Sequence, residues 1–213
     1  MTRAIATVLV LFLVVCRPVF AQDSPPAADT RGLVAGLALG GARVKVGATP
    51  DTRSVWNLSF GYRVGRDAGW LNRVRLTPQL ELMATNLRGV DIGSQPFAYA
   101  SLETSLRLSA RMATRLRVFG DISRGLVQTA EVPLPDTRIL NYSGSGGRGW
   151  AVGFEIPITP QGRGIEVRVH HVSGRFSQYE YQHDITAADM LHSATSVFVG
   201  WSGRFTGISL PWR

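Results

Sequence analysis

Hydrophobic and polar residues alternate at every second position over most of the chain after residue 31. This period of two predicts β-strands with two different faces, because successive side chains along a strand point to opposite sides. The clearest stretch is SVWNLSFGYRV, residues 54–64, in which Trp56, Leu58, Phe60 and Tyr62 share one face. Similar runs cover residues 32–46, 73–85, 98–112, 116–123, 150–158, 164–176 and 196–205. The pattern predicts about eight strands of roughly ten or more residues, the length that a tilted membrane-spanning strand requires.

The connections between these strands alternate in length. Segments near residues 47–53, 86–97, 126–148 and 173–193 are mostly long and polar and are predicted to be loops, whereas those near 65–72, 112–115 and 159–164 are mostly shorter. The Gly-rich run SGSGGRG, residues 143–149, lacks the Lys-Ser/Thr pair and the following helix of a phosphate-binding loop, so we predict a flexible loop there. Long loops at one end and short turns at the other indicate an outer-membrane barrel with its short turns in the periplasm.

Alternation alone leaves open which face of the strands is the interior. A soluble barrel would turn the apolar face inward. The polar face here mixes small residues with charges of both signs, which suits a narrow interior filled by ion pairs, and the last regular strand ends on an aromatic residue, Phe205. We therefore predict an all-β fold, a single antiparallel up-and-down eight-stranded outer-membrane β-barrel over residues 32–205, with a C-terminal tail at 206–213. The charges expected inside are those of Glu81, Glu103, Glu155 and Glu166 with Arg63, Arg75, Arg107 and Arg168.

The first 21 residues, MTRAIATVLVLFLVVCRPVFA, have the organisation of a secretory signal peptide that is cleaved after Ala21, and residues 22–31 are predicted to be a short disordered leader. Cleavage removes Cys16, the one cysteine, so the mature chain has neither disulfides nor a thiolate site. It also removes Arg3 and Arg17 and lowers the net charge from +8 to +6. We expect an exported basic protein in the bacterial outer membrane to meet phosphorylated lipids rather than nucleic acid.

The strand predicted at residues 164–176, GIEVRVHHVSGRF, carries a candidate site on its apolar face. His171 and Ser173 follow Ile165, Val167 and Val169 on that face, near the outer end of the strand. Their Cα atoms are expected about 6.7 Å apart, a spacing at which the two side chains can form a hydrogen bond. A serine becomes a nucleophile when a base takes its proton, and histidine is the usual base. Polar residues are equally ordinary at a barrel rim, so both interpretations stay open.

The segment from about residue 117 to 205 resembles the lipid A 3-O-deacylase (acyloxyacyl hydrolase) family. The run RVHHVSGRF is similar to the family's His-any-Ser-Asn motif on the penultimate strand, and ILNYSGSGGRGWAVGFEIPI is similar to its aromatic, Gly-rich sixth strand. The resemblance implies an eight-stranded outer-membrane barrel that hydrolyses an ester-linked acyl chain of lipid A in lipopolysaccharide. It implies Ser173 as the nucleophile and His171 as the base, both facing lipid.

Two positions depart from the family pattern. The family's asparagine is Gly174 here, so the backbone amide of Gly174 is the candidate oxyanion donor in its place. Loss of one such donor costs about 10²–10³ in rate. The family's glutamate, which enters the last strand, has no clear counterpart, and Asp184 or Asp189 is the nearest candidate acid; His192 is close but is not a carboxylate.

The alternative to a serine esterase is a non-enzymatic outer-membrane barrel with a structural or partner-binding role. A passive pore is disfavoured because side chains fill an eight-stranded barrel. No cofactor is expected, and no metal either, because His170 and His171 face opposite ways and His183 and His192 lack ligand spacing. Arginines at the strand ends are expected either to bind lipid A phosphates or to be solvated rim charges: Arg88, Arg138, Arg148 and Arg175.

Overall fold

The computed structural model describes residues 32–63, 74–85, 98–113, 116–134, 138–159 and 164–204. The expected signal peptide, the leader, Phe205 and the C-terminal tail lie outside the described residues, as does Arg88. The described residues form β1 (Gly32–Val46), β2 (Thr49–Arg63), β3 (Val74–Thr85), β4 (Ala98–Ala113), β5 (Leu116–Pro133), β6 (Ile139–Gly144), β7 (Arg148–Pro157), β8 (Gly164–Tyr181) and β9 (Asp184–Arg204).

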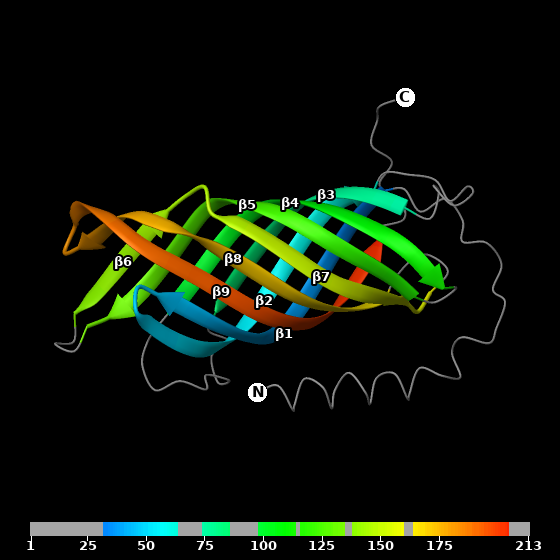
Figure 1. Ribbon diagram of the computed structural model, residues 1–213, viewed down its shortest axis with the longest axis horizontal. Helices are drawn as coiled ribbons and strands as arrows, with labels where there is room; N and C mark the ends of the chain where they lie inside the picture. Colours follow the sequence, from blue (N-terminus) through cyan, green and yellow to red (C-terminus); the bar gives the residue numbers. More distant parts are fainter. Residues whose placement is uncertain are drawn as a thin grey trace, which may run out of the picture.

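These strands close into one antiparallel ring (Figure 1). Sequence neighbours pair with each other except for β6 and β7, and β1 also pairs with β9, which closes the ring. The short strands β6 and β7 occupy one position, because each pairs with β5 on one side and β8 on the other. The result is the predicted eight-strand, up-and-down barrel. We call the end where β4 meets β5 the turn end, and the end where β8 meets β9 the hairpin end.

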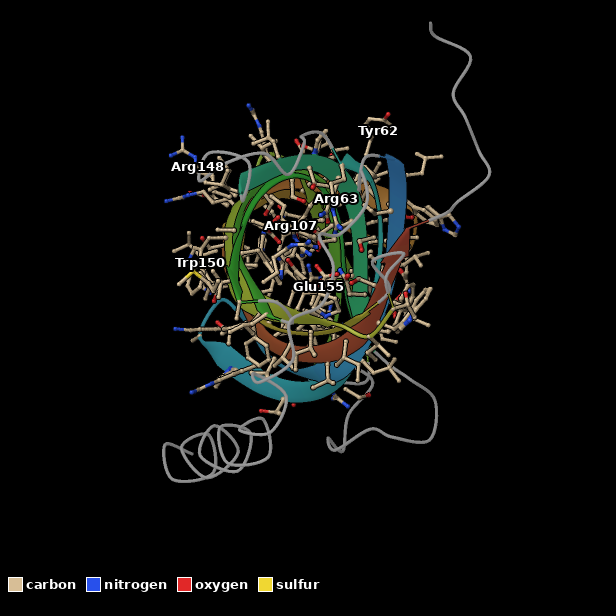
Figure 2. All side chains as sticks on the ribbon, turned by 90° about the vertical axis from the view of Figure 1, so that its right-hand side faces the viewer. Tyr62, Arg63, Arg107, Arg148, Trp150 and Glu155 are labelled. Atoms are coloured by element: carbon tan, nitrogen blue, oxygen red, sulfur yellow. The ribbon has the colours of Figure 1, made fainter. Side chains whose placement is uncertain are left out.

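The two faces of the strands are arranged inside out relative to a soluble protein. Arg168 and Glu155 on the inner face are each 2% exposed, whereas Leu108 and Val199 on the outer face are 54% and 55% exposed. This arrangement confirms the predicted facing and is the opposite of a soluble barrel, which buries its apolar face. Figure 2, a view along the barrel, shows Arg63, Arg107 and Glu155 inside the ring and Tyr62, Arg148 and Trp150 outside it.

Ion pairs fill the lumen toward the turn end. Arg107 donates to both carboxylate oxygens of Asp121 at 2.9 Å and to both of Glu166 at 2.7 and 3.1 Å. Arg168 donates to Glu81 at 2.8 Å. Buried charges require such partners, since an unpaired charge inside a protein costs several kcal/mol. The charged residues predicted to fill the interior do so, apart from Arg75, whose side chain lies outside the described part of the structure.

The lumen toward the hairpin end is filled by apolar and aromatic side chains instead. The ring of Phe176 stacks on that of His192 with centroids 4.2 Å apart. The Tyr99 hydroxyl oxygen lies 3.5 Å from His192 Nδ1. Together with the ion pairs, this cluster occupies the interior between the described strands. Its buried members include Val44, Val46, Val55, Met83, Tyr99, Tyr142, Val172 and Phe176.

Three of the segments predicted to be loops are mostly strand. The connection between β1 and β2 is only Gly47 and Ala48, and Gly47 has a φ of 60° that suits glycine in a tight hairpin. Strands β5, β6, β8 and β9 run through most of residues 126–148 and 173–193. The predicted loop at 86–97 lies outside the described residues.

These longer strands form a sheet at the hairpin end, which we call the extension. Strand β1 ends at Val46, opposite His192, so residues 184–191 of β9 continue beyond the pairing with β1. Strand β6 lies between β5 and β8, which places the hairpin-end parts of β5, β6, β8 and β9 side by side, at the left of Figure 1. A two-residue turn, Gln182 and His183 with φ of 50° and 74°, joins β8 to β9.

The Gly-rich run at 143–149 is the interruption between β6 and β7 rather than a flexible loop. Gly147 accepts a hydrogen bond from the Gly125 amide at 2.7 Å, and the Gly146 amide donates to the Gly125 carbonyl at 2.9 Å. A Cβ at Gly147 would lie 2.3 Å from the side chain of Gln128. A larger residue at Gly147 would therefore require the Gln128 side chain to shift. Among the described residues, no helix is long and apolar enough to cross a membrane.

Candidate functional site

His171 and Ser173 lie on the outer face of β8, as predicted. His171 is half-buried and Ser173 is exposed. The preceding residue, His170, points into the lumen and is 4% exposed. The alternation of β8 fixes this arrangement, because one residue separates the two outward side chains. The strand register places Trp150 and Thr195 on either side of His171.

The His171 ring is held by its neighbours on the two adjacent strands. Its Nδ1 lies 2.9 Å from the Thr195 hydroxyl oxygen, and the ring lies 5.7 Å from that of Trp150. In the part of the chain that the structure describes, the Ser173 side chain has no hydrogen bond, so the expected serine–histidine bond is not formed here. A nucleophile and its base are often loosely placed before substrate binds. The pair therefore has the right face and spacing without yet having the catalytic contact.

The two candidate acids lie far from the His171 ring. Asp189 is six positions before Thr195 in β9 and Asp184 is eleven, which corresponds to about 20 and 36 Å along the strand. Asp189 instead forms an ion pair with Arg175, and Asp184 pairs with Tyr181 at the tip of the hairpin. The structure does not bring either carboxylate to the imidazole. Thr195 occupies the place beside it, and strand register was needed to find this residue.

Gly174 faces the lumen, on the opposite side of β8 from Ser173. A Cβ at this position would lie 2.8 Å from His192 Nε2, 2.9 Å from the Gly147 Cα and 3.2 Å from Gln128 Oε1. An asparagine side chain, which the deacylase motif carries here, would have to displace these groups. Within the candidate site, Gly174 therefore offers its backbone only.

The four histidines are spread over the barrel. His170 and His192 are in the lumen, His171 is on the outer face, and His183 is in the turn of the extension. His170 Nε2 lies 3.3 Å from Glu103, which also accepts hydrogen bonds from Ser101 and Ser123. No group of three or more residues suited to a metal ion occurs among the described residues.

A cavity of about 300 Å³ lies in the extension. Strands β5, β6, β8 and β9 line it, with Ala130, Tyr142, Tyr179 and Ile185 among the wall residues. The rings of Tyr142 and Tyr179 are 5.9 Å apart. The cavity is well removed from His171 and Ser173, because Tyr179 is six positions beyond Ser173 in β8, about 20 Å along the strand.

Comparison with known proteins supports the fold. No family model and no curated protein matches the sequence. Among solved structures, the chain is similar to Neisserial surface protein A, with 12% identity, a TM-score of 0.57, and coverage of 82% of this chain and 97% of that chain. It also matches the attachment invasion locus protein Ail of Yersinia pestis, with 12% identity, a TM-score of 0.44, and coverage of 80% and 99%. The outer membrane protease OmpT from Escherichia coli matches with 10% identity, a TM-score of 0.41, and coverage of 86% and 99%.

At such low identity these matches show the fold alone. The chain has the all-β, antiparallel, eight-stranded barrel fold of bacterial outer-membrane proteins. The matches do not show the lipid A deacylase family, so the resemblance to that family stays a hypothesis about activity.

Proposed function

We propose that this chain is an integral protein of the bacterial outer membrane, delivered by a cleaved signal peptide, and that it has a non-enzymatic structural or partner-binding role at the cell surface. The observation that carries this proposal is the extension. Strands β5, β8 and β9 have 18, 18 and 21 residues, more than the roughly 9–11 that cross a bilayer. The surplus lies at the hairpin end, so it would project outside the cell.

The filled lumen supports a surface role over a pore. Arg107 and Arg168 are 6% and 2% exposed and are held by carboxylates from other strands. The aromatic cluster around Phe176 and His192 occupies the interior nearer the hairpin end. A small solute would have to displace both layers in order to pass.

Cysteine labelling of intact cells tests the orientation, since the mature chain is expected to have no cysteine of its own. His183→Cys in the turn of the extension should react with a membrane-impermeant maleimide on intact cells. Ile158→Cys is the matched control, because Ile158 is 62% exposed at the turn end; it should react only after the outer membrane is permeabilised. Labelling of Ile158→Cys alone on intact cells would contradict the proposal.

A lipid A deacylase-like esterase is the second candidate, and the placement of His171 and Ser173 favours it. Both follow the outer apolar residues of β8 toward the hairpin end, where we expect the ester bonds of an outer-leaflet lipid to lie. Ser173 Oγ would attack the ester carbonyl while its proton passes to His171. The proton would then go to the departing lipid hydroxyl, and water would release the acyl group from the serine. Thr195 would orient the ring in place of Asp184 or Asp189, and the Gly174 amide would donate to the oxyanion.

Mass spectrometry of lipid A separates the two candidates. Expression of the chain should leave lipid A unchanged if the role is non-enzymatic, and should remove one acyl chain if the esterase hypothesis holds. In the latter case Ser173→Ala and His171→Ala should each abolish the loss, and their effects should not add because the two groups act as a unit. Ser193→Ala is the matched control, since Ser193 is the direct neighbour of Ser173 on β9.

A further inference from the structure

Toward the hairpin end, cations follow the apolar residues on the outer face of three strands. On β5 and β7 the next outward residue is a cation, whereas on β1 Gly41 separates Leu39 from Arg43; on β5 the exposed Leu126 and Val127 follow the cation. These strands read Val118, Ile122 and Arg124 on β5, Val152, Trp150 and Arg148 on β7, and Leu37, Leu39 and Arg43 on β1, followed by Lys45. We call Arg43, Lys45, Arg124 and Arg148 the basic belt.

The strand register makes the basic belt a continuous surface. Arg124 is directly opposite Arg148, and Arg148 is opposite Ser173. Ser173 is in turn opposite Ser193, and Ser193 is opposite Lys45. Neighbouring strands are about 4.8 Å apart, so Arg148 and Lys45 are separated by roughly 14 Å, a gap that their long side chains can reach across. The gap between them is occupied by two serine hydroxyls, which can also donate hydrogen bonds.

The belt carries positive charge that nearby acids do not neutralise. In the described part of the chain, none of its four side chains forms an ion pair or a hydrogen bond. Two carboxylates of the strands that carry or border the belt are already paired, Asp51 with Arg53 at 2.7 Å and Asp189 with Arg175. Like charges directly opposite each other on neighbouring strands are destabilising. The Arg124–Arg148 pair therefore favours an anion between the two guanidinium groups.

From this arrangement we infer that the basic belt binds the phosphate groups of outer-leaflet lipids. Arginine matches phosphate oxygens with paired N–H donors, and charge-assisted hydrogen bonds of this kind are the strong ones. The apolar residues below the belt contact the acyl chains of the same lipid, so the headgroup and the chains are held together. Figure 2 shows Arg148 pointing away from the barrel on the same side as Trp150. The ligand is lipid A, the phosphorylated lipid of that leaflet.

This inference rests on the proposed insertion into the outer membrane, but it does not depend on hydrolysis. Native mass spectrometry of the full barrel in detergent micelles with added lipid A measures binding directly, without reference to its location in cells. The unmodified protein should retain bis-phosphorylated lipid A more strongly than the same lipid from which both phosphates have been removed. Inorganic phosphate should not displace the lipid, because it lacks the acyl chains. Equal retention of phosphorylated and dephosphorylated lipid A, or release of the lipid by inorganic phosphate, would overturn the inference.

Charge-neutralising variants locate the binding to the belt. Arg148→Gln should weaken lipid A binding roughly fivefold, and Arg124→Gln with Arg148→Gln roughly 25-fold. Arg138→Gln is the matched control: it makes the same charge change at the turn of the β5–β6 hairpin, where the guanidinium carbon of Arg138 lies 5.4 Å from the centre of the Tyr181 ring. Only variants that keep the barrel's gel shift between unboiled and boiled samples are compared. Equal binding by the Arg124/Arg148 double variant and the Arg138 variant would overturn the inference.

Discussion

Replacing Arg107 with methionine should destabilise the barrel strongly. The Arg107 guanidinium donates four hydrogen bonds, two to Asp121 at 2.9 Å and two to Glu166 at 2.7 and 3.1 Å, and it also lies 3.8 Å from the centre of the Phe119 ring. Both carboxylates are buried, so the methionine variant leaves two negative charges without their principal partner. Breaking a buried ion pair in this way costs about 3–5 kcal/mol. Methionine keeps much of the side-chain volume, so the loss reports on charge more than on a cavity.

The assay is a urea titration of the barrel in lipid vesicles, followed by tryptophan fluorescence. Adding Glu166→Gln to the Arg107 variant should recover part of the loss, since it removes one of the two uncompensated charges. The exposed pair Arg175–Asp189 provides the contrast, because its side chains are 61% and 72% exposed and exposed pairs contribute about 0–1 kcal/mol. An Arg107→Met variant that loses less than about 1 kcal/mol would refute the claim that buried ion pairs hold the lumen.

Three further changes have expected outcomes. Val199→Arg, midway along the outer apolar face of β9, should impair insertion by about 2–4 kcal/mol in a vesicle refolding titration, and unchanged refolding would contradict the assigned facing. Gly174→Asn should lower the free energy of unfolding by about 1–3 kcal/mol in the same titration, because the new side chain meets His192 and Gly147; an increase would show that the lumen has room there. Asn-Gly at Gln182 and His183 should stabilise the extension by about 1–2 kcal/mol, since both positions have positive φ, and slower proteolysis of the hairpin measures this.

The barrel and its facing were predictable because one face of each crossing strand contacts a different environment from the other. Strand β2 shows this directly. Its apolar residues from Trp56 to Tyr62 occupy every second position and lie outside, whereas the residues between them and Arg63 face inward. The extension was predicted as loop for the same physical reason. Residues 182–187 are exposed on both faces, so both faces are polar or mixed and the period of two disappears. The interruption at 145–147 was predicted as a flexible loop because its glycines have structural roles that a sequence does not display: Gly146 has a φ of 79° and Gly147 lies against the side chain of Gln128.

The candidate site was predictable only as far as it depends on one strand. The shared face of His171 and Ser173 follows from their spacing along β8. The identity of the acid does not follow from the sequence in this way, because the position of a residue along the chain does not tell which residue of β9 lies opposite the His171 ring. Register assigns that place to Thr195 and removes Asp184 and Asp189 from it. Of the basic belt, the sequence singled out Arg148 alone as a candidate for lipid A phosphates. Arg43, Lys45 and Arg124 were missed, since they come from β1 and β5 and are brought to Arg148 by strand pairing.

Spin-label accessibility along β9 in lipid bilayers tests the central claim most directly, namely an inside-out barrel with an extension beyond the membrane. Single labels at Val197, Val199 and Trp201 should be accessible to oxygen dissolved in the lipid, whereas labels at Ser196 and Phe198 should be shielded. A label at Ile185 should instead be accessible to a water-soluble nickel complex, because it lies in the extension. The opposite alternation, with Ser196 and Phe198 accessible and Val197 and Val199 shielded, would contradict the account.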